Sequence, residues 1–409
     1  MNTLSFKTSE FFHPDWLRSH IFQTINFYYP QSIDHQTGGY FHCFLDDGSV
    51  CDIRNKDLVG TARFIYIYSV GTLLGGPSDW RRAVEHGLHF LEHHFRDPVY
   101  GGYYWRLKGK IAADPTKYAY GHAFVLLAVS YAARAGISCA RRWIEEIYQI
   151  LETHFRDKPY GLYLDERSFD WSRISPYRGQ NANMHLCEAM IAAFEATGHP
   201  VYLRRAYQLA YAVTVILAGK TGGMIWEQYD ERWNPDWRYH QEYEGNEFRP
   251  YGFLPGHALE WSKLLLKLSA YCPEPWIVQR AEALYYGALN MGTDTVYGGL
   301  FFSIAPDGYV LDSDKYYWVM AEAIGASALM AAKSRRPSDL RTYQSFFEYC
   351  RNYFIDHKYG GWYPRLNRRN KRIGRIKSPP PKTDYHPIAN CLQALFAFSY
   401  TPVKSISKN

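Results

Sequence analysis

Two kinds of helix-forming segment alternate along the chain, and they differ in the spacing of their apolar residues. In the first kind, apolar residues recur every three or four positions, so that one side of a helix is apolar and the other polar. Residues 79–96 and 141–156 show this spacing, with Arg and Glu side chains on the opposite side. We expect these segments to be outer helices that bury one face against a core.

The second kind of segment is apolar almost all the way round, which is typical of a helix buried on every side. The examples are residues 123–136, 188–198, 322–332 and 390–400. Gly136 and Gly198 follow two of them as left-handed helix stops, and Pro200 strengthens the second stop. Before two of these segments, residues 103–111 and 224–233 alternate polar and apolar positions, which predicts short hairpins.

A glycine turn followed by a bulky residue recurs six times and divides the chain into copies. The turns are Gly38-Gly39-Tyr40, Gly101-Gly102-Tyr103, Gly161-Leu162-Tyr163, Gly222-Gly223-Met224, Gly298-Gly299-Leu300 and Gly360-Gly361-Trp362. A repeated spacing indicates one structural unit copied in an array. We therefore predict an all-α fold, an (α/α)6 barrel of six inner and six outer helices with short β-hairpins in the connecting loops, and one domain over residues 1–409. An open solenoid is the alternative, but the terminal copies lack a polar capping face.

Composition changes this picture in two places. Aromatic residues make up 17% of the chain, including 36 Tyr and 12 Trp, which fits both a large core and a ring-lined cleft for sugars. The net charge of +6 is too small and too spread to predict nucleic-acid binding. Residues 365–382 are the basic exception. We expect a solvated loop there, with a flap beside the ring mouth and a phosphorylated or sulfonated substrate as the alternatives.

The cysteines and the chain start predict a cytoplasmic location. The seven cysteines form no CxxC pair, so we expect reduced thiols at Cys43, Cys51, Cys139, Cys187, Cys272, Cys350 and Cys391. The first residues lack the layout of a secretion signal. No run approaches the ~18 apolar residues of a membrane helix, so no membrane partner is expected.

Polar residues stand near the start of each buried segment, and these are the candidates for chemistry. They are Arg63, Tyr120 with His122, His185, His257, Trp318 and His386. A buried charge costs several kcal/mol unless it is paired, and a closed ring would bring all of these positions to one end. His185 with Glu188 and His257 with Glu260 are three residues apart, on one face of a helix. Each pair predicts either an imidazole oriented by its carboxylate or a metal site. We predict no metal, because the Glu-first order of dinuclear bundles is missing.

Histidines together with an arginine suit proton transfer next to a carbonyl group. Imidazole exchanges protons near neutral pH, and the guanidinium of Arg63 offers two parallel donors to an oxygen that gains charge. Glycoside cleavage would need two carboxylic acids about the bond, with Glu227 and Glu260 as the available pair. No GxGxxG or P-loop motif follows a strand, so no cofactor is expected.

Four segments carry a resemblance to a known family. They are residues 177–185, ending in Asn-x-Asn-Met-His185, residues 255–261 with Pro-Gly-His257, residues 315–322 with Trp318, and Tyr385-His386-Pro387. The chain resembles the N-acylglucosamine 2-epimerase superfamily over nearly its whole length, and it is most similar to the aldose–ketose isomerase branch, which interconverts mannose and fructose. The resemblance implies an (α/α)6 barrel.

The resemblance also implies roles for single residues. His257 and His386 would be the acid/base pair, and His185, Arg63 and Glu260 would bind and polarise the sugar. Tyr120, Asn181, Arg249 and Trp318 would line the pocket.

We expect His386 to be the base that removes the C2 proton, and His257, braced by Glu260, to handle ring opening. The expected partner is a free monosaccharide, D-mannose with D-fructose or D-lyxose with D-xylulose, bound by a monomer or a homo-oligomer. A 2-epimerase that interconverts mannose and glucose, a glycoside-processing enzyme and a sugar-binding barrel remain the alternatives.

Overall fold

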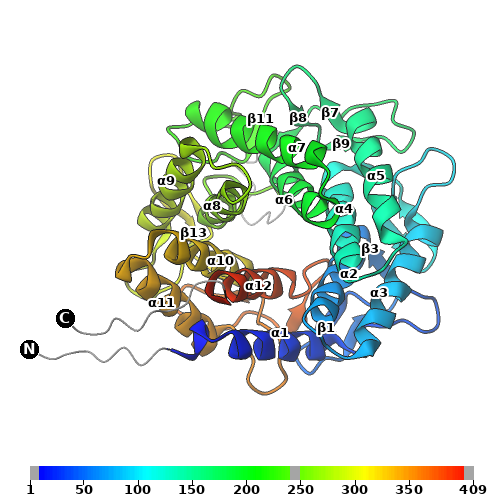
Figure 1. Ribbon diagram of the computed structural model, residues 1–409, viewed down its shortest axis with the longest axis horizontal. Helices are drawn as coiled ribbons and strands as arrows, with labels where there is room; N and C mark the ends of the chain where they lie inside the picture. The colour runs from blue at the N-terminus through cyan, green and yellow to red at the C-terminus, as the bar shows by residue number, and fades with distance from the viewer. Residues whose placement is uncertain (1–8, 240–248, 400–409) are drawn as a thin grey trace, which may run out of the picture.

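The computed structural model describes residues 9–239 and 249–399. Within them, twelve α-helices alternate between an inner and an outer ring (Figure 1). The inner helices are α2 (Leu58–Leu73), α4 (Ala119–Arg134), α6 (Gln180–Thr197), α8 (Pro255–Ser269), α10 (Tyr317–Ser334) and α12 (Tyr385–Ser399). The outer helices are α1 (Pro14–Tyr28), α3 (Ser78–Phe90), α5 (Ala140–Ile150), α7 (Pro200–Tyr211), α9 (Pro275–Gly292) and α11 (Pro337–Tyr353).

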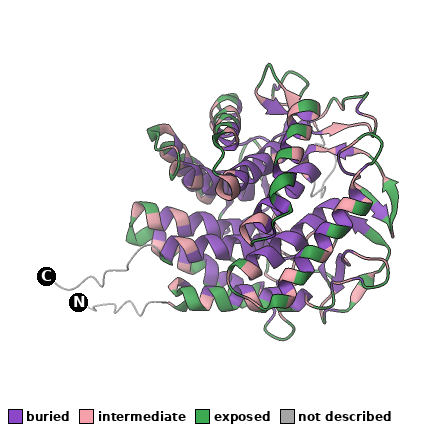
Figure 2. Ribbon diagram, turned by 45° about the vertical axis from the view of Figure 1, so that its right-hand side comes forward, coloured by how far each residue is buried: buried purple, intermediate pink, exposed green. Residues whose placement is uncertain are grey.

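The ring of inner helices is closed. Each inner helix packs against the next, and the last, α12, packs against the first, α2. Figure 2 shows the inner helices almost wholly buried, while exposed residues lie on the outer helices and in the connections. The predicted (α/α)6 barrel is therefore confirmed, and the open solenoid is wrong.

The amphipathic segments form outer helices as predicted, with one local feature that the pattern does not show. Helices α3, α5 and α7 continue into π-helical turns at Leu91–Phe95, Leu151–Phe155 and Ala212–Leu217. The buried segments begin earlier than their apolar runs indicate, at 119, 180, 317 and 385 in the four examples. The polar candidate residues therefore lie in the first two turns of the inner helices and not in loops before them.

Short antiparallel strands fill the connections. They are β1 (Cys43–Leu45), β2 (Val50–Asp52), β3 (Asn55–Asp57), β4 (Arg106–Lys108), β5 (Ile111–Asp114), β6 (Lys117–Tyr118), β7 (Arg156–Asp157), β8 (Leu162–Tyr163), β9 (Glu166–Arg167), β10 (Arg178–Gly179), β11 (Gln228–Tyr229), β12 (Ser303–Ile304), β13 (Val310–Asp312), β14 (Lys315–Tyr316), β15 (Arg365–Leu366) and β16 (Ile376–Ser378). Hairpin β4–β5 confirms the prediction for residues 103–111, and β1–β2 and β12–β13 are further hairpins in the connections. In residues 224–233, the strand β11 pairs with β10 of the preceding copy.

Pairing between neighbouring copies ties the ring together. The segment that leads into each inner helix pairs with the segment that follows the next glycine turn. The pairs are β3–β4, β6–β9, β10–β11, β14–β15, β16–β1 and the bridge Phe253–Ile304. All six inner helices therefore start at the same end of the barrel, which we call the mouth.

The glycine turns are fixed by backbone shape and by buried ion pairs. Gly39 has a φ of 69°, and a Cβ there would lie 2.7 Å from the ring of Phe90, so only glycine fits. In four copies, an Asp of the turn pairs with a lysine from the strand before an inner helix. The pairs are Asp34–Lys56, Asp97–Lys117, Asp294–Lys315 and Asp356–Lys377.

Two predictions about the surface are corrected. Cys43 and Cys51 form a disulfide across the β1–β2 hairpin, because their Cα atoms come within 5.2 Å. The prediction of reduced thiols is wrong for this pair, and one argument for a reducing compartment is lost with it.

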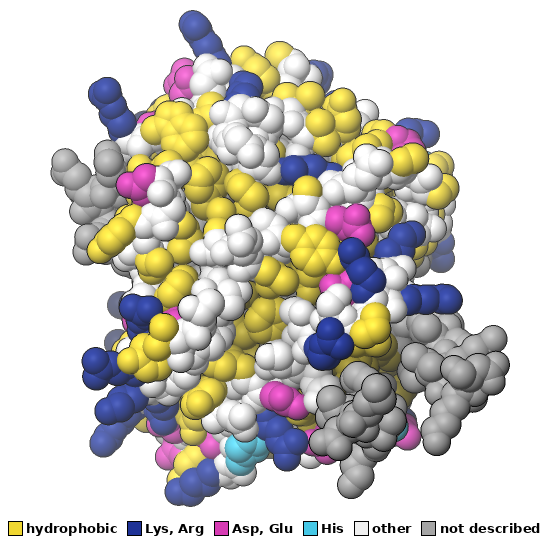
Figure 3. Space-filling view, turned by 90° about the vertical axis from the view of Figure 1, so that its left-hand side faces the viewer, with side chains coloured by type: hydrophobic (Ala, Val, Ile, Leu, Met, Phe, Trp, Pro, Cys, Tyr) yellow, Lys and Arg dark blue, Asp and Glu magenta, His cyan; other side chains and the backbone are white. Residues whose placement is uncertain are grey.

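The basic stretch 365–382 is not a plain solvated loop. It forms β15 and β16. Arg365 and Arg368 pair with Asp314 and Asp294 of the preceding copy, and Lys377 pairs with Asp356 of its own copy. It lies beside the mouth, as the flap alternative predicts, but as paired strands. On the face in Figure 3, basic side chains are interspersed with acidic and apolar ones. No helix among the described residues is long and apolar enough to cross a membrane.

Candidate active site

His386 is the second residue of α12 and is held by a carboxylate from the neighbouring inner helix. Its Nδ1 lies 2.8 Å from Oε1 of Glu322 on α10, and Asn390 Nδ2 donates to the same oxygen. Burial, followed by the charges of Arg63 and other nearby cations, holds the pKa of His386 well below its usual range. A neutral imidazole with its Nδ1 proton on Glu322 leaves Nε2 free to accept a proton.

His257 is held by a different element. Its Nδ1 lies 2.9 Å from Oε1 of Glu227, the residue before β11, and 3.1 Å from the side-chain amide of Gln180. The Gln180 amide also donates to Glu227, and Trp261 donates to the Gln180 oxygen. The prediction that Glu260 braces His257 is therefore wrong. The side chains at i and i+3 share a helix face, but a closer carboxylate comes from the preceding connection.

The two imidazoles share an aromatic neighbour. The ring of Trp318 lies with its centroid 5.0 Å from that of His257 and 5.8 Å from that of His386. Residues that are far apart in the sequence thus come together at the mouth. Trp318, predicted to line the pocket, contacts both predicted acid/base residues.

His185 completes the group of imidazoles. Its ring centroid is 6.4 Å from that of His386, and its Nδ1 lies 3.2 Å from Oε2 of Glu188, as the predicted His-x-x-Glu pairing requires. Tyr385 donates to the same Glu188 oxygen. Burial lowers the pKa of His185, and Glu188 opposes that effect.

Arg63 is a buried residue of α2 near the mouth, and its contacts come from several elements. It donates to the carbonyl oxygen of Pro381 at 3.2 Å and to the hydroxyl of Tyr120, also at 3.2 Å. Its guanidinium stacks over Phe124 and Tyr385, at 4.4 and 5.1 Å from the ring centroids. Such packing fixes the orientation of the planar donors.

Glu260 lies below the imidazoles. Its two oxygens are buried and have no hydrogen-bond partner among the described residues. Burial and the nearby carboxylate of Glu322 raise its pKa well above the usual range, which favours its protonated form. Oε1 of Glu260 lies 3.8 Å from Nδ1 of His185.

The carboxylates and imidazoles form two compact groups in the described part of the chain. The donor atoms of His185, Glu188 and Glu260, and those of Glu260, Glu322 and His386, each lie within 4.8 Å of one another. Lys263 already pairs with Glu322 inside the second group, at 2.5 Å. An ammonium therefore balances the carboxylate charge, and the absence of a resident metal stays a prediction.

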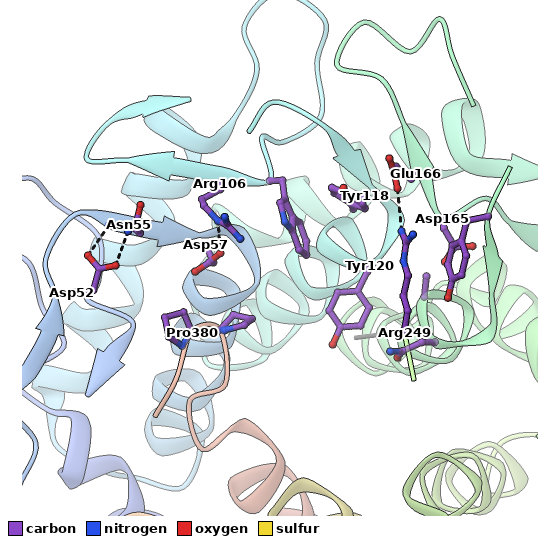
Figure 4. A pocket seen from close by; sticks show the side chains of 15 residues that line it. Asp52, Asn55, Asp57, Arg106, Tyr118, Tyr120, Asp165, Glu166, Arg249 and Pro380 are labelled. Carbon is purple, nitrogen blue, oxygen red and sulfur yellow. Dashed lines mark hydrogen bonds and ion pairs between the residues drawn. The ribbon is translucent and has the colours of Figure 1, made fainter. Parts of the chain in front are cut away.

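A cavity of about 930 Å³ opens at the mouth, and three of the four predicted pocket residues, Tyr120, Asn181 and Arg249, line it. Figure 4 shows Tyr120, Arg249 and Pro380 around the same space. Tyr120 also contacts the ring of His185, with the centroids 5.2 Å apart. One wall residue of the cavity thus touches the group of imidazoles, although the imidazoles and Trp318 do not line the cavity themselves.

The cations of the cavity wall are paired with carboxylates. Arg249 pairs with Glu166 at 3.1 Å and stacks over Tyr177, and Arg106 pairs with Asp57 at 3.2 Å (Figure 4). These contacts favour an uncharged ligand over a phosphorylated one.

Comparison with known proteins agrees with this geometry. Residues 39–390 match the family model described as N-acylglucosamine 2-epimerase. The chain belongs to the N-acylglucosamine 2-epimerase family.

Several members of the family are similar to the chain over nearly its whole length. The D-mannose isomerase of Marinomonas mediterranea is 42% identical over 381 residues, covering 93% of this chain and 96% of that protein. The D-mannose isomerase of Thermobifida fusca is 31% identical, covering 87% of each. A crystal structure of D-mannose isomerase superposes with a TM-score of 0.92 at 41% identity, covering 97% of this chain and all of that one.

Family members named for a different reaction share the fold. The structure of cellobiose 2-epimerase from Spirochaeta thermophila superposes with a TM-score of 0.86 at 21% identity, covering 97% of this chain and 99% of that one. At 21% identity, this similarity shows only that the two proteins have the same fold.

Proposed function

We propose that the chain is an aldose–ketose isomerase that interconverts D-mannose and D-fructose, with D-lyxose and D-xylulose as a further pair. The observation that carries the proposal is the meeting of His257, His386, His185 and Arg63 at one mouth. Similarity to D-mannose isomerases over more than nine-tenths of the chain selects this reaction within the family. Residues 1–409 would act as one catalytic domain, and a cytoplasmic location is part of the same proposal.

Ring opening comes first in the proposed reaction. His257 has its Nδ1 proton on Glu227, so its Nε2 is the atom that can take the proton of the O1 hydroxyl and return a proton to the ring oxygen. The ring C1–O5 bond breaks and C1 becomes an aldehyde. Trp318, in contact with both imidazoles, would pack against the open chain.

Proton transfer between carbons follows. Nε2 of His386 removes the proton from C2, and the electron pair forms the C1–C2 double bond of a cis-enediolate with its negative charge on O1. Arg63 stabilises this charge by hydrogen bonds. His185 has its Nδ1 proton on Glu188, so its Nε2 can take the hydroxyl proton of O2 and return it to O1. C1 then takes a proton from His386, and O2 becomes the ketone oxygen of fructose. No oxidant or reductant is consumed, because the hydrogen moves as a proton.

The arrangement argues against the glycoside-processing alternative, because Glu227 and Glu260 are not placed as its pair of carboxylic acids. Glu227 is hydrogen-bonded to His257, and burial favours the protonated form of Glu260. Two carboxyl groups placed about a glycosidic bond are what that chemistry needs.

The experiment is incubation of the protein with D-mannose in the presence of EDTA, with products followed by NMR. The proposal expects fructose as the first product at an undiminished rate. Glucose as the first product would establish the 2-epimerase, and inertness of a folded protein toward all free aldoses would favour a sugar-binding barrel. Loss of activity with EDTA would instead show that a metal is required.

A further inference from the structure

A buried lysine lies deeper in the barrel than the imidazoles. Lys263 on α8 is 2% exposed, and its Nζ lies 2.5 Å from Oε2 of Glu322, which is fully buried. It stands one turn after Glu260, and leucines follow it at 264, 265 and 266, so it is a charged residue inside a buried helix. A buried ion pair is weak evidence for stability, because hydrocarbon of similar shape often serves as well. Stability alone therefore does not explain why Lys263 and Glu322 form a buried ion pair.

Glu322 connects this lysine to His386. Its Oε1 accepts from His386 Nδ1 and from Asn390 Nδ2, both at 2.8 Å, while its Oε2 accepts from Lys263. Three donors leave the carboxylate fully bonded in its ionised form. Lys263 and His386 thus contact opposite oxygens of one carboxylate.

Burial favours the protonated form of Glu322, and Lys263 and Asn390 oppose this effect. Burial raises the pKa of Glu322, and the charge of Lys263 is the largest influence that opposes the rise. Glu260 and Glu188 lie close by and add acidic neighbours. Without Lys263, Glu322 would be expected to take up a proton.

We propose that Lys263 is a positioning residue that keeps Glu322 ionised, so that Glu322 holds the Nδ1 proton of His386 and leaves Nε2 as the base. The inference deepens the proposed isomerase function and rests on it for its kinetic test. Lys263 acts through Glu322, because its own hydrogen bond goes to the carboxylate.

The charged and titratable groups around Glu322 and His386 bear on the pH dependence. They are Arg63 on α2, His185 and Glu188 on α6, Glu260 and Lys263 on α8, Tyr317 on α10, and Lys382 with Tyr385 before and at the start of α12.

Two opposing effects follow when Lys263 is replaced by Met. Loss of its charge alone would raise the pKa of His386, since that charge lowers it. Protonation of Glu322 would remove the anion that contacts Nδ1 directly and would lower the pKa. Because Coulomb energies fall with distance, the nearer charge decides, and the pKa of His386 falls.

The kinetic test compares Lys263→Met with Lys267→Met. Lys267 is the next lysine on α8 and pairs with Glu195 instead, so it controls for the loss of a buried lysine. In Lys263→Met, kcat should fall roughly 10- to 100-fold, below the ~10² to 10⁴ of deleting a general base, with little change in KM. The acidic limb of kcat/KM should move to lower pH by about half a unit or more. Lys267→Met should keep the wild-type limb.

An acidic limb that stays in place in Lys263→Met, or that moves to higher pH, would overturn the inference, because Glu322 would then be ionised without Lys263.

A second variant guards against a poorly folded protein. Glu322→Gln removes the carboxylate charge directly, and adding Lys263→Met to it leaves no unpaired charge. The double variant should match the kcat of Glu322→Gln within about 2-fold, since both changes act on one unit. Additive losses would contradict the inference.

A tautomer measurement separates this inference from the proposed function. Histidine-selective ¹⁵N NMR should show His386 as the Nδ1-protonated tautomer, identified as the signal missing from His386→Asn, and as a mixture in Lys263→Met. An unchanged tautomer would overturn the role of Lys263 whatever the substrate is. Absence of mannose turnover in the wild type, with the tautomer shift present, would overturn only the proposed isomerase.

Discussion

His257 and His386 occupy matching places in two copies of the repeat, yet their surroundings differ. Each imidazole lies near the start of an inner helix, binds a carboxylate through Nδ1 and packs against Trp318. The carboxylate of His257 comes from a connection at the mouth. The carboxylate of His386 comes from inside the barrel.

The difference supports the proposed roles. His386 contacts the buried Glu322 that pairs with Lys263, and burial together with cations such as Arg63 favours its neutral imidazole, the form that a carbon base needs. His257 belongs to a network of Glu227, Gln180 and Trp261. The repeat supplies two equivalent positions, and in the proposed reaction their partners separate them into the base for carbon and the group that handles ring opening.

The largest expected effect comes from the carbon base itself. His386→Asn should lower kcat on mannose by at least ~100-fold, because proton removal from C2 loses its acceptor. Steady-state assays in both directions measure it, with circular dichroism as the check on folding. Turnover close to wild type in a folded variant would refute the role.

Ring opening can be separated from carbon chemistry by the choice of substrate. His257→Asn should lose ~100-fold or more on mannose, but much less on glyceraldehyde, a triose that cannot close into a ring. Glu227→Gln should follow the same pattern more weakly. Equal losses on both substrates would mean that His257 also acts at the carbon atoms.

Replacing Arg63 by Lys tests the cation proposed to stabilise the enediolate. The guanidinium contacts Pro381 and Tyr120 at once, and a point charge cannot keep both contacts and still present two parallel donors to the substrate. We expect kcat to fall about 10-fold or more, the scale of one lost charge-assisted hydrogen bond. A variant with wild-type kcat would show that Arg63 is not needed for the enediolate.

The smallest effect concerns stability and a histidine outside the site. His20 accepts a hydrogen bond from Trp362, and burial lowers its pKa from 6.5 to about 4. The unfolded chain therefore binds more protons below pH 6.5, and this histidine's contribution to stability is lost as pH falls toward about 4.

The loss amounts to about 3 kcal/mol in the free energy of unfolding when complete. Denaturant unfolding across this window, compared with His20→Gln, measures it, since the variant should lack this part of the pH dependence. Parallel curves for the two proteins would show that His20 does not carry it.

The sequence predicts the fold well because the signals for it are local. Helix periodicity and glycine turns at regular spacing need no knowledge of partners, and the (α/α)6 barrel follows from them. The strands that join neighbouring copies escape prediction, because most are two or three residues long and pair with residues from the next copy.

The part of the site that leaves a local signal in the sequence could also be predicted. Histidines at repeat-equivalent positions could be found, and so could the local pair of His185 with Glu188. The partners of His257 and His386 could not, because Glu227 and Glu322 lie 30 and 64 residues away from them in the chain. Lys263 and Glu322 did leave a signal, as charged residues inside otherwise apolar helices.

The most direct test of the account is the fate of the C2 hydrogen of mannose in D₂O, followed by NMR for the wild type and for His386→Asn. The account predicts fructose that carries one deuterium at C1, or partial return of the original hydrogen to that position, and no such transfer in the variant. Deuterium entering at C1 as fast in His386→Asn as in the wild type, or glucose deuterated at C2 as the main product, would contradict it.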